Sequence, residues 1–188
     1  MRTSLQPDIS PGFFLMLAGT VLLLPLPWCL ALLVAAAVHE GCHLLALRLC
    51  AGIPLRCSVG AGGAAIASAP LPGYQGLICT LAGPLGGLLL APLGRWFPRL
   101  ALCAAVQSAF NLLPVPNLDG GNILRIFLEM ILPRERAHKL CRYAEVLMLI
   151  SIIVSALYFT FILKLGLLPV LAAGTVIIKG RFGKTPCK

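Results

Sequence analysis

The stretch AAAVHEGCHLLALRL, residues 35–49, decides how the rest of the chain is interpreted. Three ionisable residues, His39, Glu40 and His43, interrupt a run made almost entirely of Ala, Val and Leu. An ionisable side chain inside a membrane costs roughly 3 kcal/mol or more, so such a group usually has a function. Residues four apart lie on one face of a helix, so His39 and His43 can offer two imidazole nitrogens to one metal ion.

Glu40 directly follows His39, so we expect its side chain to approach the shared metal ion from one side. Together the residues form the pattern His-Glu-x-x-His, which in zinc proteases supplies two zinc ligands and a general base. The pattern therefore predicts one Zn²⁺ per chain, with Glu40 as the catalytic residue. The alternative is a polar cluster that hydrogen-bonds neighbouring helices.

The composition indicates an integral membrane protein. Of the 188 residues 59% are hydrophobic and 11% are charged, and the mean hydropathy is +0.96, whereas a soluble domain needs a more polar surface. The formal charge of +9 comes from basic residues that flank apolar segments, which favours anionic lipid headgroups over nucleic acid as the partner. The eight cysteines form no Cys-x-x-Cys pair, so we interpret them as packing residues and expect no disulfide framework.

The apolar segments predict an all-α polytopic membrane protein of about six transmembrane helices, forming a single domain over residues 1–188 with no appended soluble domain. The first segment is expected to be an uncleaved span rather than a signal peptide. A Gly- and Pro-rich segment, 51–73, predicts a short β-hairpin or re-entrant segment, and 121–132 predicts a short helix at the membrane surface. The six predicted spans are 13–26, 28–49, 75–93, 100–113, 145–163 and 166–178.

The basic residues predict the orientation in the membrane. Six spans place both termini on one side, and twelve of the fifteen Lys and Arg residues then fall on that side. This asymmetry predicts that both termini are cytoplasmic. His39 lies nine residues before Arg48, about 13 Å below the cytoplasmic edge, so we expect the metal site to be reached by water from the cytoplasm.

A catalytic zinc usually has three protein ligands and an open position. The best candidate for the third ligand is Asp119, in FNLLPVPNLDGG (110–121), where prolines stop a helix and glycines permit a tight turn. The alternative for Asp119 is an ordinary turn residue or a helix N-cap. The other candidate, His138, lies in the basic stretch PRERAHKLCR and is more typical of a solvated surface residue.

The motif HEGCH, followed by NLLPVPNLDGG and accompanied by LAGPLGG, resembles the site-2 protease family of intramembrane zinc metalloproteases. No inserted PDZ domain and no appended CBS domain are expected, and this compact build is most similar to the sporulation branch, the stage IV proteases that process a membrane-associated pro-sigma factor. The resemblance implies that His39, His43 and Asp119 ligate zinc, that Glu40 activates water, and that Asn111 helps to position substrate. Asn111 could instead make a helix-end hydrogen bond. Asn117 departs from the family, which more often has Pro there.

The predicted function is zinc-dependent cleavage of a membrane-protein substrate within or near the bilayer. A substrate helix must unwind first, because its peptide groups are hydrogen-bonded within the helix. The segment SVGAGGAAIAS (58–68), with Gly62 and Gly63, could bind the unwound strand at an extended edge, or could be merely a small-residue loop. Regulatory membrane partners are expected. The alternative function is a zinc-binding membrane protein without protease activity, such as a transporter or a scaffold, but neither needs a general base beside the ligands.

Overall fold

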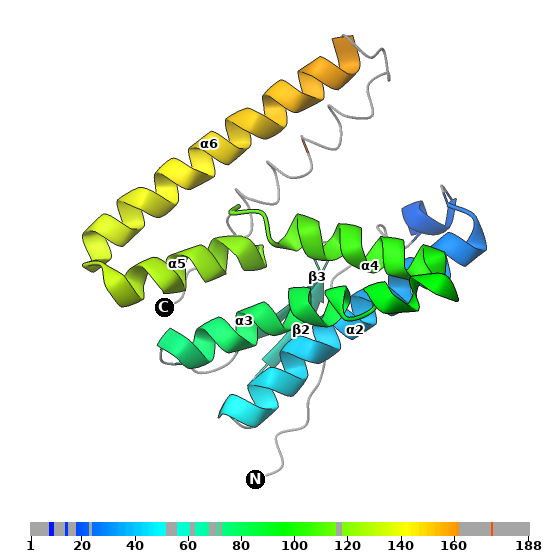
Figure 1. Cartoon of the computed structure of the whole chain (residues 1–188), viewed down its shortest axis with the longest axis horizontal. Coiled ribbons are helices and arrows are strands. Elements are labelled where there is room, and N and C mark those ends of the chain that lie inside the picture. The colour runs from blue at the N-terminus through cyan, green and yellow to red at the C-terminus, as the bar shows by residue number, and fades with distance from the viewer. Residues whose placement is uncertain are drawn as a thin grey trace. The chain divides into compact units, whose positions relative to one another are not determined.

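Helix α2 (Leu26–Ala51) is the central element of the first of two compact units in the computed structural model, Met1–Asn111 and Leu112–Lys188 (Figure 1). The structure describes residues 8–9, 14, 18–22, 24–51, 56–60, 63–67, 71, 73–115, 118–161 and 174. In α2 the buried side chains Ala31, Ala35, His39 and Leu47 recur at multiples of four residues. This spacing gives the helix one inward-facing stripe, and the rest of its surface exposes apolar side chains of the kind that contact lipid.

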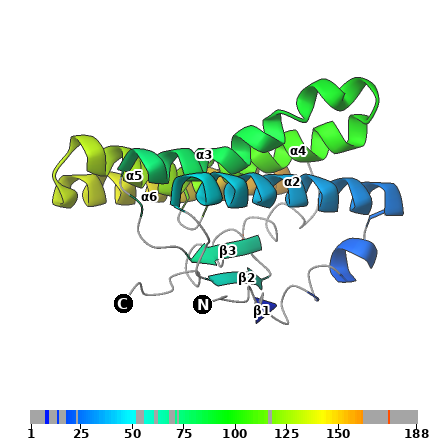
Figure 2. The ribbon, with the colours of Figure 1, turned by 90° about the horizontal axis from the view of Figure 1, so that it is seen from below.

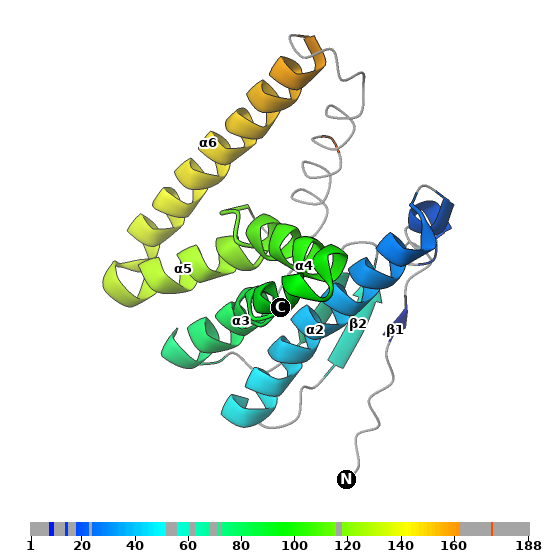
Figure 3. The same ribbon diagram turned by 45° about the vertical axis from the view of Figure 1, so that its right-hand side comes forward.

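Helices α3 (Gly73–Leu88) and α4 (Pro98–Asn111) both pack against α2 and against each other (Figure 3). A short 3₁₀ helix, η1 (Ala91–Arg95), joins them. The buried residues of α3 are mainly small, as the motif LAGPLGG predicts. Small residues allow helix backbones to approach closely inside a membrane protein.

Three short strands belong to the same unit: β1 (Asp8–Ile9), β2 (Arg56–Gly60) and β3 (Gly63–Ala67). Strands β2 and β3 pair antiparallel with Gly60 opposite Gly63, within the segment for which the sequence predicts a hairpin or re-entrant segment. Strand β1, which the sequence does not predict, pairs parallel with β2. Figure 2 shows the strands together on one side of α2.

The second unit contains α5 (Asp119–Ile131) packed against α6 (Arg134–Phe161). Helix α5 corresponds to the surface helix predicted at 121–132, but it begins two residues earlier. The predicted boundary is wrong because a turn is expected at Asp119 and Gly120, whereas both belong to the first turn of the helix. Helix α6 extends the predicted fifth span toward its N-terminus by eleven residues, through the basic stretch after Pro133.

Within the described residues, three helical segments are long and apolar enough to cross a membrane: Leu26–Cys50, Gly73–Arg95 and Arg134–Tyr158. They correspond to the predicted second, third and fifth spans and identify an integral membrane protein. The predicted fourth span is helix α4, whose 14 residues extend about 21 Å, less than the roughly 30 Å of a bilayer core. The predicted first span is described only in part, with residues 18–22 helical, and the sixth span lies outside the described residues apart from 174.

Candidate metal centre

Helix α2 brings His39 and His43 to the same face, as their spacing predicts. His39 is 2% exposed and His43 is half-buried, and both lie on the stripe that contains Ala35 and Leu47. The two imidazole rings are 4.9 Å apart between centroids and nearly perpendicular, with an interplanar angle of 83°. Two imidazoles on consecutive turns of one rigid helix form a preorganised half of a metal site.

A hydrogen bond to helix α3 fixes the orientation of the His43 ring. Its Nδ1 lies 2.8 Å from the backbone carbonyl oxygen of Cys79. A carbonyl oxygen can only accept, so Nδ1 carries the proton and donates it, which leaves the lone pair on Nε2. Histidine ligands in metal sites are commonly oriented in this way, through a hydrogen bond from the nitrogen that does not bind the metal.

Asn111, the last residue of α4, contacts the other histidine. Its side-chain amide nitrogen lies 3.2 Å from Nε2 of His39 and donates a hydrogen bond to it. Asn111 follows the buried residues Ala104 and Ser108 on the inner face of α4. The helix therefore places this amide within reach of whatever binds beside His39.

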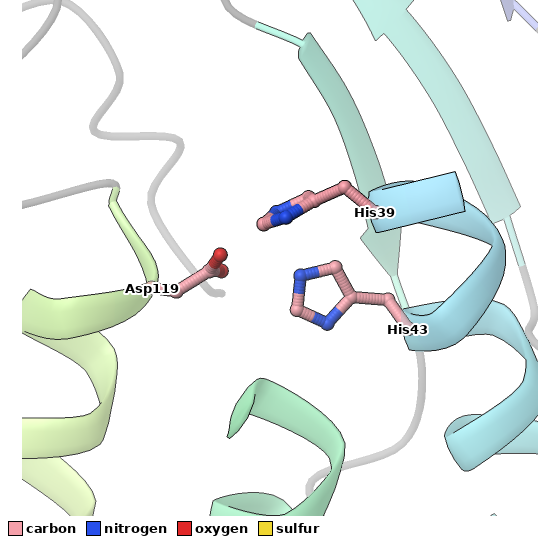
Figure 4. A group of neighbouring side chains, drawn as sticks. All are labelled: His39, His43 and Asp119. Carbon is pink, nitrogen blue, oxygen red and sulfur yellow. The ribbon is translucent and has the colours of Figure 1, made fainter. Parts of the chain in front are cut away.

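Asp119 supplies the carboxylate of the candidate group. The ligand atoms of His39, His43 and Asp119 all lie within 4.8 Å of one another (Figure 4). Two imidazole nitrogens and one carboxylate oxygen are a donor set that suits catalytic zinc, which takes three protein ligands and keeps one position open. His39 is buried, and the other two side chains are half-buried.

Two described residues shortly before Asp119 are buried. Val115 and Leu118 are 1% and 3% exposed, and the amide of Leu118 donates to the carbonyl of Val115 at 3.2 Å. A methyl group at Gly120 would overlap the carbonyl oxygen of Leu112, so only glycine lets the first turn of α5 lie this close to the preceding chain. Asp119 is the first residue of α5, with Leu118 as its N-cap. The N-cap alternative for Asp119 is therefore wrong.

The remaining predicted residues are placed as follows. Glu40 is half-buried on α2, directly after His39. His138 is exposed on α6 and is not part of the candidate group found among the described residues. Gly63 is the first residue of β3, whereas Gly62 lies outside the described residues. Sequence reasoning missed the carbonyl of Cys79, because a backbone acceptor carries no signal in the residue type.

Comparison with known proteins gives a family match over part of the chain and a similar fold. The model of Peptidase family M50 matches residues 93–152, a segment that contains both Asn111 and Asp119. No curated protein matches the chain. Among solved structures, the chain is similar to the site-2 protease from Methanocaldococcus jannaschii, with a TM-score of 0.67 and 19% sequence identity over 96% of this chain and 90% of that one. The family model thus covers about a third of the chain, and the likeness to the solved structure shows that the chain has the fold of a site-2 protease.

Proposed function

We propose that this chain is a zinc-dependent intramembrane endopeptidase that cleaves membrane-spanning or membrane-associated proteins within or near the bilayer. The observation that carries the proposal is the convergence of His39, His43 and Asp119 within 4.8 Å, and it is supported by the match of residues 93–152 to the model of Peptidase family M50. These three residues hold the zinc. The metal supplies Lewis acidity, which activates water near neutral pH and polarises the scissile carbonyl group.

Glu40 is the general base. It is adjacent to His39 on a continuous helix, as the base of a His-Glu-x-x-His site is. Glu40 takes a proton from that water as it attacks the peptide carbonyl, and it later passes the proton to the departing amine. A half-buried carboxylate suits this exchange because it remains accessible to water while most of its surroundings are protein.

Asn111 positions the substrate. Its amide is a hydrogen-bond donor beside His39, where the carbonyl oxygen of the scissile peptide gains negative charge. A preorganised donor at such a point stabilises the transition state more than the ground state. The paired edge of β2 and β3, including Gly63, receives the unwound substrate as an added strand.

The site is reached from the cytoplasm. Helix α2 is continuous from Leu26 to Ala51, so His39 lies about 13 Å along the helix axis from Arg48. Arg48 is exposed in the last turn of α2, where a basic residue fits a cytoplasmic membrane surface.

One experiment tests the proposal against a zinc transporter or scaffold. Detergent-purified protein is assayed for zinc content and for cleavage of a panel of membrane-tethered substrates, one of them a membrane-associated pro-sigma factor of the type processed in sporulation. We expect about one zinc per chain and cleavage of at least one substrate, abolished in Glu40→Gln. Bound zinc without cleavage of any substrate, in protein reconstituted into liposomes, would favour the non-proteolytic alternative.

A further inference from the structure

Three glycines of α3 each receive a side chain from a neighbouring helix. A methyl group at Gly86 would overlap Sγ of Cys42 on α2, and one at Gly87 would overlap Oγ of Ser108 on α4. Gly83 faces His43: an added methyl would overlap Nε2 of the ring and lie 2.6 Å from both Cδ2 and Cε1. The three atoms nearest to that methyl all belong to the His43 imidazole. One face of α3 thus packs against a candidate metal ligand.

The contact at Gly83 coincides with the hydrogen bond at Cys79. These two residues are one helical turn apart, so they lie on the same face of α3. The Cys79 carbonyl accepts from Nδ1 of His43 at 2.8 Å, while the bare backbone of Gly83 leaves room for the opposite side of the ring. A ring that moved away from a side chain at position 83 would have to lengthen or lose the bond to Cys79.

We propose that Gly83 is a positioning residue for the metal centre: with the Cys79 carbonyl, it holds the His43 imidazole so that Nε2 is presented to zinc. This inference rests on the proposed function, because it assigns a role toward the metal. It goes beyond close helix packing, which any of the three glycines would serve. Gly86 is the matched control, since it is on the same helix and packs against the adjacent residue of α2, Cys42, which is not a ligand.

The test compares Gly83→Ala with Gly86→Ala by zinc affinity, measured through competition with a chelator, and by the absorption spectrum of the cobalt(II)-substituted proteins. We expect Gly83→Ala to weaken zinc binding by about 10–100-fold, the usual effect of disturbing a residue that orients a ligand. Gly86→Ala should change it by less than about 3-fold. The cobalt spectrum should change only in Gly83→Ala. Equal losses of affinity in the two variants would overturn the inference and leave Gly83 a packing residue.

A second measurement needs no metal. Thermal unfolding of the metal-stripped protein is compared for wild type, Gly83→Ala, His43→Ala and the double variant. The Tm loss caused by Gly83→Ala should largely disappear in the His43→Ala background, because the overlapping ring is gone. If Gly83→Ala does not fold, the double variant should recover folding, and its failure to do so would overturn the inference.

The outcomes also separate this inference from the proposed function. Well-folded wild-type protein that binds no added zinc would overturn both. Zinc-loaded wild type with a Tm loss that persists without His43 would overturn the role of Gly83 alone.

Discussion

At the scale of single residues, Glu40 and the zinc ligands should respond differently to mutation. Glu40→Gln keeps the size of the side chain and leaves all three proposed ligands in place, but removes the base. We expect zinc content to stay near wild type while cleavage falls by about 10²–10⁴-fold. Metal analysis and a cleavage assay on the same preparation check this. Turnover at the wild-type rate would show that another group accepts the proton.

Mutation of Asp119 and of His138 distinguishes the two candidates for the third zinc ligand. Asp119→Ala removes a ligand, so zinc affinity and cleavage should fall together, by more than the 10–100-fold typical of a residue that only orients a ligand. His138→Ala should leave both unchanged, because that side chain is exposed on α6. Chelator competition on the two variants distinguishes them. The reverse pattern would mean that zinc is held by His138.

Much of the candidate site could be predicted from residue spacing. His39 and His43 share a face because they are four apart, and the helix is long enough to make that periodicity reliable. Asp119 is 76 residues beyond His43, so its place in the group rests on tertiary structure that no local rule gives. The hydrogen bond from His43 to Cys79 could not be predicted from the sequence, because its acceptor is a backbone carbonyl, which every residue type carries.

At the scale of elements, the start of α5 shows where local propensity misleads. Glycine is a poor helix former, and the helix predicted from the sequence begins only at Gly121 and leaves Gly120 outside. The structure places Gly120 inside, because the absence of a side chain there lets the helix begin against the carbonyl of Leu112. Packing thus outweighs the propensity cost of about 1 kcal/mol per glycine.

Gly120→Ala should therefore destabilise the protein although alanine is the better helix former. The overlap with a fixed backbone carbonyl predicts a loss of about 1–3 kcal/mol, with weaker zinc binding because Asp119 is the preceding residue. Thermal unfolding and chelator competition measure the two effects. Gly41→Ala is the control for stability, since a methyl group there meets nothing within 4 Å. If both variants unfold at the wild-type temperature, the close approach at Gly120 has no energetic importance.

At the scale of the whole molecule, the distribution of basic residues predicts the topology. Reporter fusions at the two ends of the chain should both report the cytoplasm, because six spans return the chain to its starting side. The described residues contain three of these spans, and α4 is too short to count as a fourth by length alone. Ends that report opposite sides of the membrane would require an odd number of spans and would exclude the six-span arrangement.

The four-residue spacing of the buried stripe in α2 also fixes the distance and direction of the two histidines relative to Arg48. Each residue inserted between His43 and Arg48 would move the histidines about 1.5 Å further from Arg48 along the helix axis and turn them by about 100°. An insertion of one residue would therefore point both imidazoles away from the interior. An insertion of seven, close to two full turns, would restore their direction about 10 Å deeper. Under the proposed function, the number of helical turns between the histidines and Arg48 therefore sets the depth at which a substrate is cut.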